Sequence, residues 1–167
     1  KLFEDISPNS FVVINNDDKY GRRLKELTSA QIVTYGIENR ADILAKDLKF
    51  ALSHAEFLLT TVKRKINLKT RFIGRHNVYN ALASCAWALK AGIKPAVIKS
   101  VFGKFYLIPG RLEKIDCARG FSVFVDYAHT HDALMNVIRA LKQVSFNRVI
   151  VVFGCGGQRD KTKRPKM

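Results

Sequence analysis

Two stretches that follow apolar runs are the first places to look for chemistry in this sequence. The loop Gly154-Cys155-Gly156-Gly157 follows the run at 148–153. Backbone N–H groups in such a loop can bind a phosphate. The nucleotide-loop pattern G-x-x-x-x-G-K-[ST] is not matched, however, because Lys161-Thr162 lies too far from Gly157. The loop by itself therefore favours a tight turn that ends a strand.

The second stretch is Asp126-Tyr127-Ala128-His129. An Asp at the carboxyl end of a strand can accept hydrogen bonds from ribose hydroxyls, and His129 could contact a phosphate or titrate. Alternatively, Asp126 binds local backbone donors and Thr130 caps the next helix. The residue types leave both interpretations open.

A pair of asparagines forms a third candidate. Asn77 and Asn80 are three residues apart at the start of a predicted helix, so they share a face. Paired carboxamides match the donor and acceptor edge of adenine. From spacing alone, the simpler interpretation is that Asn77 caps the helix and that His76 has a structural role.

The elements that must position these residues follow an α/β pattern. A buried strand at 11–15, a helix capped by Asp17 or Asp18 and ending near Leu27, and a strand at 31–36 predict a parallel unit. Other predicted elements are an antiparallel meander within 43–73, helices at 77–91 and 95–102, a hairpin at 111–125, a helix at 130–144 and a strand at 148–153.

Composition excludes several classes of protein. Hydrophobic residues make up 47% of the 167 residues, which excludes wholesale disorder. The sequence has no apolar stretch long enough for a transmembrane helix and no signal-peptide core at its start. The three cysteines, Cys85, Cys117 and Cys155, lack metal-ligand spacing. They predict reduced thiols in a cytoplasmic protein without a metal site of its own.

Charge allows a different class of function. The net charge is +15 and the pI is about 10, which suits either nucleic acid or anionic small molecules. The basic residues are mostly dispersed, and no aromatic stacking platform accompanies them. We therefore expect no nucleic-acid partner, and a basic nucleic-acid-binding module is kept as the alternative.

The ends and the middle of the chain suggest its organisation. The sequence opens without Met and stops two residues after Pro165, which would suit the first turn of a helix. We expect an excerpt of a longer protein. Pro109-Gly110 lies in a stretch without periodicity and marks the expected boundary between residues 1–108 and 109–167.

Four stretches together resemble the Mur ligase family, in the family's order and spacing. The last stretch most resembles the UDP-N-acetylmuramoyl-tripeptide synthetases (MurE), and residues 13–18 (VINNDD) also resemble that group. The resemblance covers essentially the whole chain. The stretches are residues 74–81 (GRHNVYNA), 109–113 (PGRLE), 125–134 (VDYAHTHDAL) and 153–165 (FGCGGQRDKTKRP).

This resemblance implies fold and activity. Residues 1–108 would be the carboxyl half of a central ATPase domain, and 109–167 the start of a Rossmann-like carboxyl-terminal domain. The implied reaction uses ATP and Mg²⁺ to form an acyl phosphate on UDP-MurNAc-L-Ala-D-Glu. The amine of a third amino acid, meso-diaminopimelate by resemblance, then forms the amide. We expect a monomer without a membrane partner.

The resemblance also implies roles for single residues. Asn77 and Asn80 would contact adenine, Arg111 the nucleotide, Asp126 the ribose, and His129 would lie beside the nucleotide. Arg159 would contact the incoming amino acid. The family's phosphate loop, its magnesium ligands, its carbamylated lysine and its Asp-Asn-Pro-Arg motif are not in this sequence. We therefore expect no catalytic residue within the chain and no ligase activity from it alone.

Two positions depart from the family, and one rival shares its fold. His131 stands where the family usually has Pro, and Gln158 where it usually has Asp beside the substrate arginine. The second departure bears on the choice of amino acid. Cyanophycin synthetase and folylpolyglutamate synthetase are related ligases with a different substrate.

Overall fold

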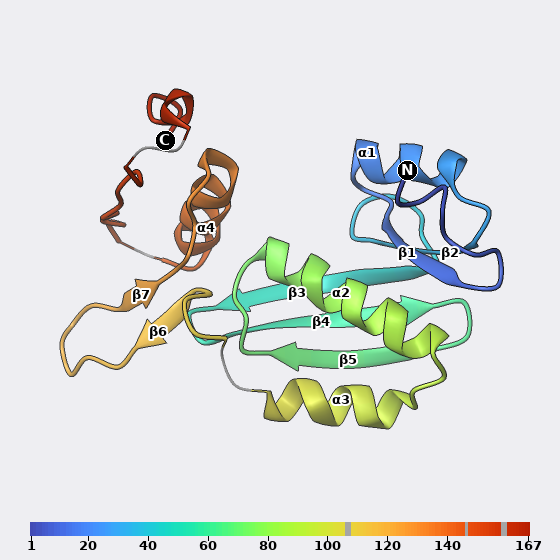
Figure 1. The fold of residues 1–167 in the computed structure, drawn as a ribbon. Helices are drawn as coiled ribbons and strands as arrows, with labels where there is room; N and C mark the ends of the chain where they lie inside the picture. The colour runs from blue at the N-terminus through green and yellow to red at the C-terminus, as the bar shows by residue number, and fades with distance from the viewer. Residues whose placement is uncertain (106–107, 146, 158–159) are drawn as a thin grey trace.

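A five-stranded mixed sheet organises the first two thirds of the computed structural model, which describes residues 1–105, 108–145, 147–157 and 160–167. The strand order is β1-β2-β3-β4-β5 (Figure 1). Its strands are β1 (Phe11–Asn15), β2 (Gln31–Gly36), β3 (Ile43–Ala51), β4 (His54–Thr61) and β5 (Lys65–Thr70).

The first two strands form the predicted parallel unit. β1 pairs with β2 in parallel, and β2 pairs in parallel with the start of β3. Between β1 and β2, the helix α1 (Lys19–Leu24) continues into a 3-10 turn (Lys25–Leu27). The Asp18 carboxylate caps α1 by accepting from the backbone N–H groups of Tyr20 and Gly21. Asp18 is thus the cap, and Asp17 has another task.

The remaining strands form the predicted antiparallel meander. In β5 every second residue is buried, and β4 alternates in the same way up to Leu59. This period of two turns one face toward the core and the other toward solvent. The long helix α2 (Arg75–Lys90) covers the core face with Val78, Leu82 and Cys85. Helix α3 (Pro95–Lys104) packs along the edge strand β5.

The rest of the chain adds a small unit beyond one end of this sheet (Figure 1). Strands β6 (Glu113–Ile115) and β7 (Val123–Val125) form the predicted hairpin. Helix α4 (His131–Val144) begins at His131, where Thr130 accepts the N–H of Ala133 as N-cap. The absence of Pro at this position therefore does not prevent the helix from starting here.

The strand predicted at 148–153 is wrong. These residues have no strand partner among the described residues, and Ile150 and Val152 are 70% and 96% exposed. An apolar run of this kind suits a strand buried inside a parallel sheet. A strand forms only where a neighbour accepts and donates its ladder hydrogen bonds, and the described residues offer none here.

The predicted α/β class is confirmed. Among the described residues, no helix is long and apolar enough to cross a lipid bilayer. The buried apolar residues form two clusters that matter for the site. The main cluster lies between the meander and α2, and a smaller one joins Ile73 at the end of the sheet to Leu112, Ala140 and Val144. This smaller cluster fixes the hairpin and α4 against the sheet.

Candidate functional site

A cavity of about 680 Å³ lies where α2, α3, α4 and the loop before β6 meet. It collects side chains from stretches far apart in the sequence. Asn77, Asn80, Arg111 and Asp126 are among them, so four of the five residues predicted at a nucleotide line one space. The other lining residues are Phe72, His76, Ala81, Ser84, Val101, Phe102, Phe105, Ile108, Ala133, Asn136 and Val137.

The first turn of α2 brings the two asparagines to the cavity. Gly74 precedes the helix with φ +93°, and a Cβ there would lie 2.7 Å from Cβ of Ala140. Glycine therefore permits both the turn and the close approach of α4. Asn77 does not cap the helix. Its side-chain amide donates to the Ile73 carbonyl at 2.8 Å, and its oxygen accepts from the Asn80 amide at 3.2 Å.

This pairing orders the two carboxamides. Asn77 is buried, whereas Asn80 is exposed. The bond between them uses one N–H of Asn80 and leaves its second N–H and its oxygen for another partner. Asn80 is thus the asparagine better placed to read a base, with Asn77 fixing its orientation.

The loop before β6 and the end of β7 position the charged pair. The Asp126 carboxylate accepts from the N–H of Leu112 and from the N–H of Ala128, both at 2.8 Å. The alternative of local backbone donors is thus present in the structure. Each carboxylate oxygen keeps a further acceptor site, so Asp126 can still accept from a hydroxyl group.

Arg111 lies in the same loop with its guanidinium 5.8 Å from the centre of the Tyr127 ring. The turn is held by the N–H of Gly110, which donates to Glu113, and by the N–H of Tyr127, which donates to the Gly110 carbonyl. Among the described residues, Arg111 has no ion pair with a carboxylate. Its exposed guanidinium can therefore take an anionic group of a ligand.

His76 is a lining residue that was expected to be structural. Burial lowers the pKa of His76, the Asp126 carboxylate opposes this shift, and the Arg111 guanidinium adds to it. The imidazole is therefore neutral at neutral pH. A neutral imidazole adds no charge to the cavity.

Neither His129 nor Arg159 is among the residues described at the cavity. His129 is not among the lining residues. Its Nδ1 lies 2.9 Å from the Tyr127 carbonyl, and its own carbonyl accepts from Lys163. Arg159 and Gln158 lie outside the described residues. The Gly154–Gly157 loop does not line the cavity, and the Gly157 carbonyl accepts from Arg164 at 2.5 Å.

The apolar walls of the cavity were missed by sequence reasoning. Phe72 and Phe105 approach at 5.8 Å between ring centres, and α4 adds the apolar Val137 together with the polar Asn136. Phe72 follows a strand and Phe105 ends a helix, so neither carried a motif. The signal available in the sequence was only that Asn136 and Val137 lie within the helix after the Asp126 stretch.

The arrangement suits a ligand with a flat base, hydroxyl groups and an anionic part. The walls are largely apolar, the carboxamide of Asn80 and the carboxylate of Asp126 supply hydrogen-bond partners, and Arg111 supplies positive charge. Such a combination is typical of cofactor and nucleotide sites. Among the described residues there is no group of three or more His, Cys, Asp or Glu side chains that could hold a metal ion.

Two family models match the chain, and each match contains residues that line the cavity. The Mur ligase middle domain matches residues 1–88, and the Mur ligase glutamate ligase domain matches residues 110–167. α2 lies almost wholly in the first match, and Arg111, Asp126 and α4 lie in the second. The cavity is therefore built from both.

Curated relatives carry one activity in their names. A UDP-N-acetylmuramoyl-L-alanyl-D-glutamate--2,6-diaminopimelate ligase of Syntrophomonas wolfei subsp. wolfei is 39% identical over 169 residues, covering 100% of this chain and 35% of that protein. A ligase of the same name from Bacillus velezensis is 43% identical over 155 residues, covering 93% of this chain and 32% of that protein. The chain thus spans about a third of the length of these relatives.

A solved structure agrees in fold. The structure of a UDP-N-acetylmuramoyl-L-alanyl-D-glutamate--2,6-diaminopimelate ligase superposes with a TM-score of 0.69 at 34% identity. The match covers 95% of this chain and 34% of the other. Since the middle-domain model alone matches more than half of the 167 residues and the second model continues to the last one, the chain belongs to the Mur ligase family.

Proposed function

We propose that this chain is the nucleotide-binding middle part of an ATP-dependent ligase that adds meso-diaminopimelate to UDP-MurNAc-L-Ala-D-Glu in peptidoglycan synthesis. The observation that carries the proposal is the cavity shared by Asn77, Asn80, Arg111 and Asp126. The names of the relatives supply the substrate and the amino acid. We also propose a cytoplasmic site of action, since all three cysteines are free.

Four of the lining residues have proposed roles that follow from their chemistry. The Asn80 carboxamide reads the adenine edge, and Asn77 orients it. The Asp126 carboxylate accepts from the ribose hydroxyls, because its oxygens keep acceptor sites beside the two backbone donors. Arg111 neutralises phosphate oxygens as negative charge builds up on them. His129 follows Asp126 by three residues in the sequence, and we propose that it lies beside the nucleotide.

The proposed reaction has two steps. The γ-phosphoryl group of ATP passes to a substrate carboxylate, which gives an acyl phosphate and ADP. The amine of the incoming amino acid then attacks the acyl carbon, and phosphate leaves as the amide forms. Arg159 is proposed to bind the carboxylate of that amino acid.

Mg²⁺ would neutralise the phosphates in this chemistry. The described residues contain no acidic or histidine cluster that fits it, so we assign no step to a metal held by them. We likewise propose, from the sequence, that residues 1–108 and 109–167 belong to two domains that meet at the nucleotide.

The test is an assay of the complete gene product that contains this chain. Purified protein is incubated with ATP, Mg²⁺, UDP-MurNAc-L-Ala-D-Glu and meso-diaminopimelate. We expect phosphate release that needs both substrates, and a product heavier by one diaminopimelate residue in mass spectrometry. L-lysine in place of diaminopimelate is the control for the choice of amino acid.

Two results would contradict the proposal at different levels. Product with lysine but not with diaminopimelate would retain the ligase and change its amino acid. ATP consumption that does not depend on the UDP-MurNAc peptide would remove the proposed substrate altogether. The isolated 167-residue chain is expected to release no phosphate in the same assay.

A further inference from the structure

A carboxylate outside the cavity holds together two segments that are distant in sequence. Asp17 lies in the loop after β1, at the carboxyl ends of the parallel strands. Its two oxygens accept from the N–H groups of Ile37, Glu38 and Asn39 at 2.6, 3.1 and 2.7 Å. They also accept from the Asn39 side-chain amide at 3.0 Å and from the Tyr79 hydroxyl at 2.8 Å.

The surroundings of Asp17 are built around this carboxylate. A Cβ on Gly36 would lie 3.1 Å from each carboxylate oxygen, so a side chain there would press on both. Partial burial by itself would raise the pKa of Asp17. The donors from Ile37, Asn39, Glu38 and Tyr79 outweigh that effect and hold the pKa at about 2. The group is therefore an anion at neutral pH and is held by a fixed set of donors.

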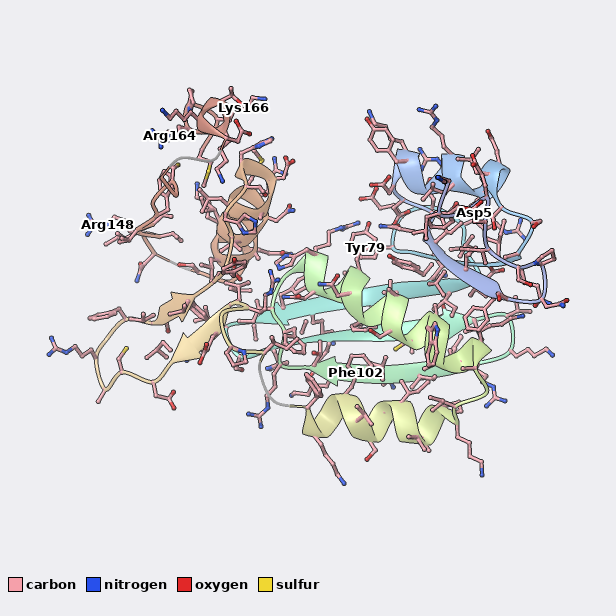
Figure 2. All side chains as sticks on the ribbon, viewed as in Figure 1. Asp5, Tyr79, Phe102, Arg148, Arg164 and Lys166 are labelled. Carbon is pink, nitrogen blue, oxygen red and sulfur yellow. The ribbon has the colours of Figure 1, made fainter. Side chains whose placement is uncertain are left out.

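The same contacts attach α2 at its first turns. Tyr79 binds Asp17, and Arg75, one turn earlier, forms an ion pair of 2.7 Å with Glu38. Residues four apart lie on one side of a helix. Tyr79 lies between α2 and the N-terminal part of the chain (Figure 2). The helix is thus anchored at two points, by Asp17 in the loop after β1 and by Glu38 in the loop after β2.

The opposite flank of these turns faces the cavity. At 3.6 residues per turn, Asn77 and Asn80 project from the flank away from Arg75 and Tyr79, with the sheet-facing side between them. Asn80 and Tyr79 are neighbours in sequence, so a rotation of the helix that loosens one flank moves the other. The anchor on one side therefore sets the direction of the carboxamide on the other.

We propose that Asp17 and Tyr79 are positioning residues for nucleotide recognition: they fix the rotation of α2 so that Asn80 meets the adenine edge. This inference rests on the proposed function, because it needs an adenine nucleotide in the cavity. Neither residue touches the cavity, and neither takes part in the reaction. Their effect is on the discrimination between bases.

The test measures nucleotide binding rather than turnover. Titration calorimetry with ADP and with GDP is carried out on the complete gene product and on Tyr79→Phe, which removes one hydroxyl group. The matched control is Tyr35→Phe, because the Tyr35 hydroxyl is half-buried but makes no hydrogen bond among the described residues. We expect ADP affinity to fall about fivefold in Tyr79→Phe, as for one hydrogen bond between Asn80 and adenine that is no longer well made, and the preference for ADP over GDP to fall with it.

A double-mutant cycle separates positioning from a purely structural role. If Tyr79 acts through Asn80, then Tyr79→Phe changes the ADP-to-GDP preference little in an Asn80→Ala background. Asp17→Asn should behave like Tyr79→Phe in direction, and melting temperatures show whether each variant is folded.

The outcomes distinguish this inference from the proposed function. A wild type that binds no ADP overturns the nucleotide site and the inference with it. A wild type that binds ADP, with Tyr79→Phe indistinguishable from Tyr35→Phe, overturns the inference alone. Additive effects in the double-mutant cycle, or a lower melting temperature with an unchanged base preference, also overturn it.

Discussion

The two parts of the chain differ in how they bury their apolar side chains. Residues 1–105 close a core of thirteen buried residues between the meander and the helices α2 and α3. The described residues between 108 and 167 close no such core. Leu112, Ala140 and Val144 are buried only together with Ile73, which belongs to the first part. The second part is therefore held by contact with the first, whereas the first carries its own hydrophobic stabilisation.

The cavity lies along this contact and depends on it. Asn77 and Asn80 come from the part with the core, and Arg111 and Asp126 come from the part without one. A substitution in the core should change the free energy of unfolding, and a substitution at the contact should change ligand binding in the cavity. Variants in the core and variants at the contact separate these two effects.

The largest expected effect is on the core of the first part. Leu59 is fully buried in the sheet, whereas Ile150 is 70% exposed. We expect Leu59→Ala to lower the free energy of unfolding by about 3 kcal/mol, the transfer and cavity cost of a buried leucine. Ile150→Ala should stay within about 0.5 kcal/mol. Urea denaturation of the 167-residue chain measures both, and equal losses would remove the contrast between the two parts.

The next effect concerns the charge that the second part brings to the cavity. In the complete gene product we expect Arg111→Ala to reduce transition-state stabilisation by about 2–4 kcal/mol, as for loss of one preorganised cationic group. Lys114→Ala is the control, since Lys114 is exposed on β6 and does not line the cavity. kcat/KM for ATP is the measurement. An unchanged rate in Arg111→Ala would refute the role of Arg111.

A single added Cβ atom at Gly74 would test the contact between the two parts of the chain. Gly74 and Gly92 both have positive φ, +93° and +83°, so alanine should cost about 1–2 kcal/mol of stability at either position. Only at Gly74 would the new Cβ collide, at 2.7 Å from Ala140 of α4; at Gly92 nothing lies within 4 Å. We expect Gly74→Ala to be the more destabilising and to weaken ADP binding as well. Equal behaviour of the two variants would show that α4 does not press on this turn.

The smallest effect is the acid dependence of the first part. The pKa of Asp17 lies at about 2, below the value of 3.8 for a free side chain. The lowered pKa contributes stability above about pH 4, and this contribution is lost as the pH falls toward 2. We expect the difference in unfolding free energy between wild type and Asp17→Asn to shrink over that range. It should be modest, because Asp17 is only partly buried.

The control for the acid dependence is Asp5→Asn. Asp5 is exposed, and its carboxylate accepts no hydrogen bond among the described residues. Urea denaturation at several pH values compares the two variants with wild type. A difference for Asp17→Asn that stays constant from pH 5 to pH 2 would contradict the assigned cause of the lowered pKa.

Much of the fold could be predicted because its signals are local. The alternation in β5, the glycine after α2 and the threonine before α4 each act over a few residues. The strand at 148–153 was predicted wrongly for the opposite reason. Its apolar character is visible in the sequence, but strand formation depends on a partner strand, and the described residues supply none.

The site shows the same division. Asn77, Asn80, Arg111 and Asp126 were named from the sequence by resemblance to a family, and the structure brings them to one cavity. Phe72, Phe105 and Asn136 carry no motif and were missed. His129, although it belongs to a motif, is not a lining residue, and Arg159 lies outside the described residues. The roles of all these residues remain predictions.

The sequence by itself determined the α/β class, the family and the order of most helices and strands, because periodicity, caps and motifs are written in neighbouring residues. Only the tertiary structure decided which of two adjacent aspartates caps α1 and which binds the Ile37–Asn39 turn and Tyr79. The same holds for the asparagine pair, in which Asn77 donates to the Ile73 carbonyl and accepts from Asn80 instead of capping the helix. The bonds of Asp17 join residues twenty or more apart, so they depend on how the chain is packed and no local pattern records them.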